Sequence, residues 1–578
     1  MDHEIILSSN NLTIKQVSLF ASKKIKFTIS EKAIDKIKEK RNIIIERLGE
    51  NQSWPSTKAE QANEKSNINN NNSSSNSNSS TSSKSGSNSG EKESTSTDVI
   101  MNQQGTLIPI LHEQLLINNS SVIGNQYLSD KVTRAALLIQ LNLFCSGNSG
   151  VALDVVIWLA KRLNEDNLPL AIDGCSLGVS DQVALAQMSL PLIGKTIPLP
   201  NGNQPPIESE NINKVPSLFP PPSSSPSSDQ GSSSGSTNNN NTTTTTTNIK
   251  ERSQTSIQLS MKESLSLINS NSITLAQGAI LLNDINTLMG GLDVSACFAL
   301  EAFRGNLNSI NSIVAKVHNQ TGQVQCNNNL QNIMNFSKLW DHSESRFHQD
   351  PLSFRCISQI HGAAYSAYDW CHNIYEKEIN LSVDNPLISS EDYNLYSNGN
   401  IDTSLLALSM DTLRSALCKC LKISGERLIK LPWKPFGNIP PSTNANHFNN
   451  HSLIVNLCKL AASSIGKCCQ LASPTLNLYG GYQLDEGFED TAPSTPLSIE
   501  NTKLLLEEGW KIITIEIIIS IFCIKQREIS SSSLGFGLRS LYNNIIPLIP
   551  LNQSVDNPIV FDTRKIESLI KTHISDNT

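Results

Sequence analysis

Apolar residues recur at helical spacing through most of the chain. Across 137–163 they form two stripes, separated by the turn-forming run SGNSG at 146–150. This pattern predicts a helix, a turn and a second helix. Further helix-length patterns cover 257–300, with a break predicted near Gly290 and Gly291, and also 357–379, 403–423, 452–471 and 501–529.

Strand patterns are scarce. Alternating apolar residues favour one short strand within 18–29. The apolar stretch 512–524 contains Glu516 and is shorter than the ~20 residues that a bilayer requires, so we predict a core helix there. No repeat of fixed period points to a solenoid. The predicted fold class is therefore mainly α.

Two low-complexity tracts interrupt the helical pattern. Residues 66–98 are mostly Ser and Asn, and 216–248 pass from Pro and Ser into Asn and Thr. Such segments cannot bury enough apolar surface to offset the conformational entropy lost on ordering. We therefore predict disordered inserts within a single domain. With their flanks the inserts are 54–104 and 199–249, and the domain consists of 1–53, 105–198 and 250–578.

Charge and cysteine content exclude several classes of function. The net charge of −7, from 45 basic and 52 acidic residues, is spread along the chain. This argues against a nucleic-acid or membrane partner, which would favour a concentrated basic surface. The twelve cysteines include no C-x-x-C spacing, so we expect free thiols in a reducing compartment. Without the pattern of a signal peptide at the N-terminus, a cytoplasmic location is expected.

Spacing alone offers only weak candidates for chemistry. His447 and His451 have the spacing of a metal pair, but their polar surroundings favour a surface loop. His342 and His348 flank acidic residues that could bind a metal, although such a stretch more often forms a solvated face. The run GCSLG at 174–178 matches the G-x-S-x-G pattern of a nucleophile elbow, yet no strong strand pattern precedes it.

A longer motif gives the chain a family resemblance. Residues 349–362 read QDPLSFRCISQIHG, which resembles the Q-D-x-Y-S-L-R-C-x-P-Q-V-x-G signature of the histidine and phenylalanine ammonia-lyases. In the same order, LINS at 267–270 resembles L-I-N-G, EINLSVDNPL at 378–387 resembles E-x-N-S-x-x-D-N-P-L, and SGER at 424–427 resembles S-E-R-R. The resemblance implies a bundle of long helices, usually a homotetramer in which each active site draws residues from three subunits.

The resemblance also locates the segment that forms the family's electrophile. Active members convert an Ala-Ser-Gly tripeptide of their own backbone into a methylidene-imidazolone ring. Here Ser180 is present, Val179 replaces the Ala, and the Gly is deleted or replaced by Asp181. A Cβ on the residue whose nitrogen attacks would obstruct this contorted closure. We therefore expect no ring and no other cofactor, and an unmodified Ser180.

Other catalytic positions of the family have also changed. In the family a loop with the catalytic tyrosine lies near residue 53. Here residues 51–53 lead instead into Trp54 and the first insert. Leu352 stands at the position of a second tyrosine of the family. Asn118-Asn119 replaces the Ser-His pair that selects substrate in the histidine enzymes, and Ile401 and Asp402 replace a Phe-His pair.

Four positions that contact substrate or electrophile in the family are retained: Asn269, Gln349, Arg355 and Asn385. In one interpretation Arg355 still holds a carboxylate through a bidentate pair. In the other, which we favour, these residues satisfy buried polar groups within the bundle. The segment around Asn385 has the composition of a turn.

The resulting hypothesis is a catalytically inactive member of the aromatic amino acid lyase family. It would serve as a scaffold, a small-carboxylate binder, or a partner in a homo-oligomer or in a mixed oligomer with an active relative. The alternative is an active ammonia-lyase that converts histidine or an aromatic amino acid to the α,β-unsaturated acid. A third possibility is an architectural protein with no small-molecule site.

Overall fold

The computed structural model describes most of the helical sequence. The described residues are 4–48, 108–122, 124–197, 256–260, 262–389, 391–433, 436, 445–477, 487–550 and 562–577. Both predicted inserts, 54–104 and 199–249, lie outside these residues. The same holds for the start of the first insert, where the family carries its catalytic tyrosine.

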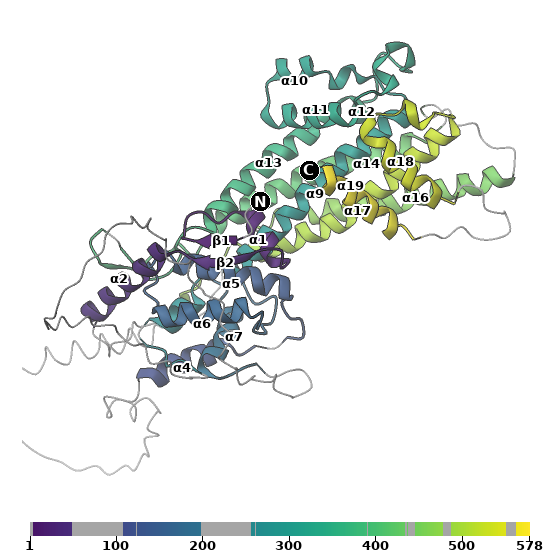
Figure 1. Cartoon of the computed structure of the whole chain (residues 1–578). Helices are drawn as coiled ribbons and strands as arrows, with labels where there is room; N and C mark the ends of the chain where they lie inside the picture. The colour runs from purple at the N-terminus through teal and green to yellow at the C-terminus, as the bar shows by residue number, and fades with distance from the viewer. Residues whose placement is uncertain are drawn as a thin grey trace, which may run out of the picture.

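Long helices run side by side through the middle of the molecule (Figure 1). They are α9 (Ser272–Phe303), α13 (Ile357–Glu378), α14 (Ser404–Lys430), α16 (Ala445–Leu471) and α17 (Thr495–Gln526). Helix α9 is the central member, because it packs against α13, α14 and α17 as well as α5 (Asp130–Phe144). It is apolar on nearly every side, as expected of a helix enclosed by other helices.

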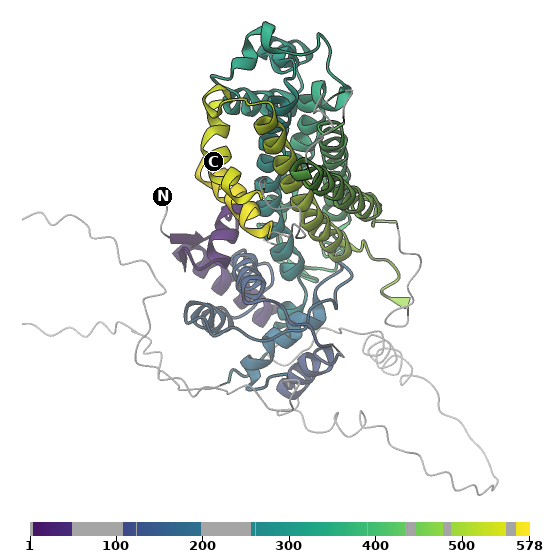
Figure 2. The ribbon, with the colours of Figure 1, turned by 90° about the vertical axis from the view of Figure 1, so that its right-hand side faces the viewer.

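Shorter elements gather at the two ends of this bundle (Figures 1 and 2). One end holds β1 (Glu4–Leu7), α1 (Ile14–Ala21), β2 (Lys26–Ile29), α2 (Glu31–Leu48), α4 (Ile108–Asn119), α6 (Leu153–Asn164), α7 (Gln182–Ser189), η2 (Leu190–Ile193) and α8 (Glu263–Ile268). The other holds η3 (Leu307–Ile310), α10 (Ser312–His318), α11 (Thr321–Ile333), η4 (Lys338–Trp340), η5 (His342–Glu344) and α12 (Leu352–Arg355). The remaining elements are β3 (Leu387–Ile388), β4 (Leu395–Tyr396), η7 (Ser531–Ser533), α18 (Phe536–Ile545), η8 (Ile546–Leu548) and α19 (Arg564–Asn577).

The mainly α fold class is confirmed, as are most predicted helices. Helices α5 and α6 occupy the region where two helices and a turn were predicted. Residues 512–524 lie in α17, and nearly all of their side chains are buried. By length and composition two stretches, Glu263–Phe303 and Ser452–Leu471, could cross a membrane, but 83% of the apolar window of the first is buried inside the protein.

The predicted helix break near Gly290 and Gly291 is wrong. Helix α9 continues through both glycines, which act as packing positions. A Cβ on Gly290 would lie 2.8 Å from Ile574, and one on Gly291 would lie 2.9 Å from Trp510. The break falls instead at 269–271, between α8 and α9.

Two other local predictions need correction. Only the end of 18–29 is a strand: β2 pairs in parallel with β1, which the sequence pattern did not reveal, and α1 ends at Ala21. His447 and His451 lie within α16 rather than in a surface loop.

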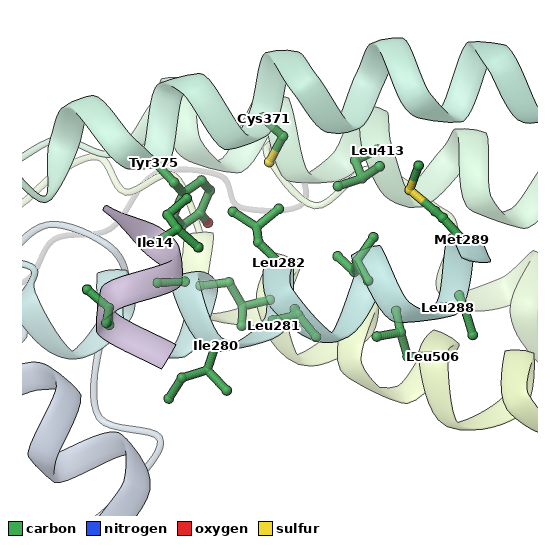
Figure 3. Packing of buried hydrophobic residues seen from close by; sticks show 14 of the residues in the cluster. Ile14, Ile280, Leu281, Leu282, Leu288, Met289, Cys371, Tyr375, Leu413 and Leu506 are labelled. Atoms are coloured by element: carbon green, nitrogen blue, oxygen red, sulfur yellow. The ribbon is translucent and has the colours of Figure 1, made fainter. Parts of the chain in front are cut away.

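Apolar side chains from four helices interlock around the middle of α9 (Figure 3). Leu282 and Met289 of α9 point toward Cys371 and Tyr375 of α13 and Leu413 of α14. Gly278 permits the closest contact, because a Cβ there would lie 2.1 Å from the Tyr375 ring. This packing fixes α9 as a rigid axis between the two ends of the molecule.

Candidate functional site

The segment around Ser180 lies against the connection between α8 and α9 and against residues 401–403. Val179 forms an isolated antiparallel bridge with Asp402. The carbonyl oxygen of Gly178 accepts a hydrogen bond from the Thr403 hydroxyl at 2.6 Å. The structure therefore brings together two segments that the sequence comparison had assigned separately to the family's active site.

Ser180 itself is buried and held at several atoms. Its backbone adopts φ +74°, a left-handed conformation that is uncommon for residues with a Cβ. Its N–H donates to Asn271 Oδ1 at 2.8 Å, and its hydroxyl donates to the Ile268 carbonyl oxygen at 2.7 Å. The hydroxyl is thus used as a hydrogen-bond donor inside the protein, and the backbone strain is offset by these contacts.

Asp181 performs a structural task that the sequence did not reveal. Its carboxylate accepts hydrogen bonds from the N–H groups of Ile273 and Thr274, at 2.9 and 2.8 Å, and from the Thr274 hydroxyl at 2.6 Å. The residue that precedes α9, Asn271, makes no capping bond of its own. Asp181 therefore caps α9 from a distant part of the chain.

Burial has an electrostatic consequence at Asp181. Loss of water raises the pKa of its carboxyl group, although hydrogen bonds from Ser176, Thr274 and Ile273 work in the opposite direction. The positive end of the α9 dipole favours the ionised form as well. The backbone N–H of Asp181 is also engaged, since it donates to the Ser270 carbonyl oxygen at 2.8 Å.

Asn269 and Asn385 lie beside the Ser180 segment and contact each other. The Asn269 side-chain amide donates to Asp384 Oδ1 at 3.1 Å and to the Asn385 carbonyl oxygen at 2.7 Å. Asp384 also pairs with the buried ammonium group of Lys262, at 2.6 Å. The Asn385 side chain accepts from the backbone N–H of Asn398 at 2.9 Å. At this end, retained polar residues satisfy one another, as the favoured interpretation predicted.

Gln349 and Arg355 are far from this cluster. Phe354, which precedes Arg355, stacks on Phe303 at the last residue of α9, with ring centroids 4.1 Å apart. Asp181, in contrast, binds the first turn of α9. A helix of 32 residues is about 48 Å long, and Figure 1 shows α7 and α12 at opposite ends of the molecule. Within one chain the four retained residues therefore cannot form a single site.

The environment of Arg355 also differs from that of Asn269. Gln349, Leu352 and Arg355 are all exposed. Among the described residues the side chains of Gln349 and Arg355 make no hydrogen bond, although the Arg355 charge acts on the Asp350 carboxylate. Burial of polar groups thus explains Asn269 but does not explain Arg355. The expected solvated face at 341–350 is only partly correct, because Asp350 is buried and accepts from the Asn306 N–H at 2.6 Å.

A family profile described as "Aromatic amino acid lyase" matches residues 12–546. The chain belongs to the aromatic amino acid lyase family. It is 26% identical over 476 residues to the histidine ammonia-lyase of Alkaliphilus oremlandii, a match that covers 82% of this chain and 84% of that enzyme. A second histidine ammonia-lyase, from Caldanaerobacter subterraneus, is 28% identical over 346 residues, which is 60% of either chain.

Solved structures of the family share this fold. The ergothionase of Treponema denticola superposes with a TM-score of 0.72 and 20% identity, covering 99% of each chain. At that level of identity the likeness concerns the fold alone. The positions that the family resemblance identified are therefore set in a family scaffold, and their chemistry has to be argued from their own contacts.

Proposed function

We propose that this chain is a catalytically inactive member of the aromatic amino acid lyase family, which serves as a subunit partner and binds small carboxylates. Asp181 is the observation that carries this proposal. Whether the family's glycine is deleted or replaced, the residue that follows Ser180 here is an aspartate, and its carboxylate caps the central helix. A residue that stabilises the fold in this way cannot be freely rearranged.

The family's ring requires a bond from the backbone nitrogen of residue 181 to the carbonyl carbon of residue 179. That nitrogen donates to Ser270, and Val179 is bridged to Asp402. The Asp181 Cβ adds a steric obstruction that glycine avoids. Closure would also pull the carboxylate away from the α9 N-terminus. These residues do not fit the ring, so we expect Ser180 to be unmodified and the protein to need no cofactor.

A general base is a second requirement for elimination of ammonia. Leu352, which corresponds to one tyrosine of the family, offers no hydroxyl group that could transfer a proton. The position of the other tyrosine falls outside the described residues. This loss agrees with the inactive role.

The exposed pair Gln349 and Arg355 supports the binding role. The Arg355 guanidinium interacts with the Asp350 carboxylate through charge but makes no hydrogen bond to another described residue, so its N–H groups can hold a carboxylate through two parallel hydrogen bonds. Asn269 and Asn385 can join it only if they come from another chain, since α9 separates the two groups by about 48 Å. We therefore propose that the chain assembles as a homo-oligomer or with an active relative, whose activity it would change by withholding residues from shared sites.

The alternative is an active ammonia-lyase acting on histidine or an aromatic amino acid. Two observations favour it: Ser180 is retained beside Asn269, and the matched relatives are named histidine ammonia-lyases. This function would need both an electrophile at Ser180 and a substitute base.

Mass spectrometry of the peptide that contains Ser180 tests the proposal directly. We expect the unmodified mass, no ring absorbance in the near ultraviolet, and no urocanate or cinnamate formed from histidine or phenylalanine. Loss of two waters together with the absorbance would refute the inactive role. The partner role is tested by mixing the protein with an active relative and measuring the oligomer and its activity. If the relative neither binds the chain nor changes in activity, the partner role is wrong.

A further inference from the structure

A second group of polar side chains is buried in the bundle, near the contact of α9, α11 and α13. Asp293, Cys326 and His361 come from these three helices, and none is more than 2% exposed. One ligand atom from each, a carboxylate oxygen, a sulfur and a ring nitrogen, lies within 4.8 Å of the others. The group is separate from the Ser180 cluster and from Arg355.

Two glycines explain why Cys326 and His361 lie so close together. Helices α11 and α13 touch backbone to backbone, since a Cβ on Gly322 would lie 2.1 Å from the Gly362 carbonyl oxygen. His361 is adjacent to Gly362, and Cys326 is one turn beyond Gly322, on the same face of α11. The close approach of the two helices therefore sets both side chains beside α9.

The carboxylate of Asp293 is at the centre of the group. Its Oδ1 lies 2.8 Å from His361 Nδ1 and 3.5 Å from Cys326 Sγ. Its Oδ2 accepts hydrogen bonds from the Tyr365 hydroxyl at 2.7 Å and from the Asn329 side chain at 3.2 Å. Tyr365 and Asn329 thus hold the carboxylate in a fixed orientation, as outer partners of metal ligands do.

One ring nitrogen of His361 lacks a hydrogen-bond partner among the described residues. This nitrogen, Nε2, is buried. A buried polar atom without a hydrogen-bond partner is unfavourable. The ring meets the group through its other nitrogen, Nδ1, which lies 2.8 Å from Asp293 Oδ1 and is the nitrogen that would bind an ion shared with this carboxylate.

We propose that Asp293, Cys326 and His361 bind a divalent cation of the zinc class. Thiolate, imidazole and carboxylate are the three ligand types that zinc accepts, and softer or harder ions suit this mixed set less well. Binding forms a metal–sulfur bond and releases the thiol proton to solvent. The two negative ligands then balance the charge of the ion, which matters at a buried site.

Burial indicates a structural role for this ion rather than a catalytic one. Structural zinc sites are closed, with four protein ligands, whereas catalytic sites leave one position open. Three ligand atoms gather here among the described residues; Cys297, one turn after Asp293 in α9, donates to the Leu330 carbonyl oxygen of α11 and is not one of them. The ion would tie α11 and α13 to the central helix.

Metal analysis of the full-length protein tests this inference. The protein is produced in zinc-supplemented medium and purified with a reducing agent but without chelator. We expect one zinc ion per chain in the wild type. Cys326→Ser keeps a hydrogen-bond donor toward Asp293 but removes the thiolate, and should lower the zinc affinity at least about tenfold. Cys371→Ser is the matched control, because Cys371 is an equally buried cysteine outside the group; it should keep its zinc.

Equal zinc content in the wild type and Cys326→Ser would overturn the proposal, as would zinc at background level in both. If Cys326→Ser does not fold, cobalt titration of the wild-type protein decides the matter. A thiolate-to-cobalt absorption band that saturates at one equivalent supports the site, and its absence refutes it. Tyr365→Phe should weaken cobalt binding by about 10–100-fold, since it frees the carboxylate from its outer partner.

Discussion

Residues of the family motifs have different surroundings at the two ends of α9. At the N-terminal end Asn269, Ser180 and Asp181 are buried, and their hydrogen bonds go to one another or to the helix. At the C-terminal end Arg355 is exposed, and its side chain makes no hydrogen bond to another described residue. Polar residues of the family motifs can thus serve the fold at one end of α9 and stay available for a ligand or another chain at the other end.

The largest expected effect concerns the buried ion pair behind Asn269. Lys262→Met removes the cation that neutralises Asp384 at 2.6 Å, with both side chains at most 6% exposed. Leaving one buried charge unpaired typically costs 3–5 kcal/mol. We expect a loss of about this size in the free energy of unfolding, measured by urea denaturation.

Two variants check that the loss arises from the unpaired charge. Lys503→Met breaks an exposed pair with Glu500 and should change stability little. The double variant Lys262→Met/Asp384→Leu should recover much of the loss, because no charge is then left buried. If the double variant is as unstable as Lys262→Met, packing rather than charge dominates this end of α9.

A smaller effect is expected from Glu301, a buried carboxyl group near the other end of α9. Burial raises its pKa from the ordinary 4.5 to about 7, although its side chain accepts from Ser337 and Gly535. The unfolded chain therefore loses this proton first as pH rises. Stability should fall between pH 4.5 and about 7 by roughly 3 kcal/mol, at about 1.4 kcal/mol per pKa unit.

Glu301→Gln isolates this contribution, because the amide resembles the protonated acid and does not titrate. The variant should match the wild type near pH 4.5 and exceed it in stability above pH 7, as measured by thermal unfolding across that range. Glu426→Gln on the surface should leave the pH profile unchanged. Parallel profiles for the wild type and Glu301→Gln would contradict the raised pKa.

Loss of the helix cap at Asp181 should cost less than loss of the ion pair. Asp181→Ala removes the acceptor for two N–H groups of α9, and cap substitutions of this kind cost about 1–2 kcal/mol. Asp181→Asn keeps an acceptor oxygen and should cost less. Denaturant unfolding of both variants measures the difference. Equal stability of Asp181→Ala and the wild type would remove the structural explanation for the missing glycine.

Sequence reasoning predicted the helical fold well, because long amphipathic and apolar segments have a periodicity that single residues cannot disturb. The sequence pattern predicted a break near Gly290 because glycine disfavours helices. In the structure the helix continues, and the missing side chains of Gly290 and Gly291 leave room for Ile574 and Trp510. The strand β1 escaped prediction because it spans only four residues. Short elements carry too little pattern to be recognised.

The candidate site was predicted only in part, for a geometric reason. Motif matching assigned Asn269 and Arg355 to the same site of the family, but it contains no information on the distance between them within one chain. Nor does a sequence reveal that Asp181 caps a helix that begins almost a hundred residues later. The distance between the two positions and the capping by Asp181 both depend on where α9 lies in the bundle. That position is determined by the helices that pack against it.

The smallest effect on stability, and the sharpest test of the comparison, concerns Arg355. Arg355→Ala should change the free energy of unfolding by less than about 0.5 kcal/mol, because it removes an exposed side chain that makes no hydrogen bond to a described residue. The same variant should abolish any rise in melting temperature caused by histidine, urocanate or cinnamate. Arg355→Lys keeps the charge but not the bidentate geometry, and should retain only part of that rise.

A ligand-induced rise that survives in Arg355→Ala would mean that the exposed end of α9 does not hold the carboxylate. If no carboxylate stabilises even the wild type, the binding role fails. The proposal that Ser180 is unmodified would still stand, because the two proposals depend on opposite ends of the helix.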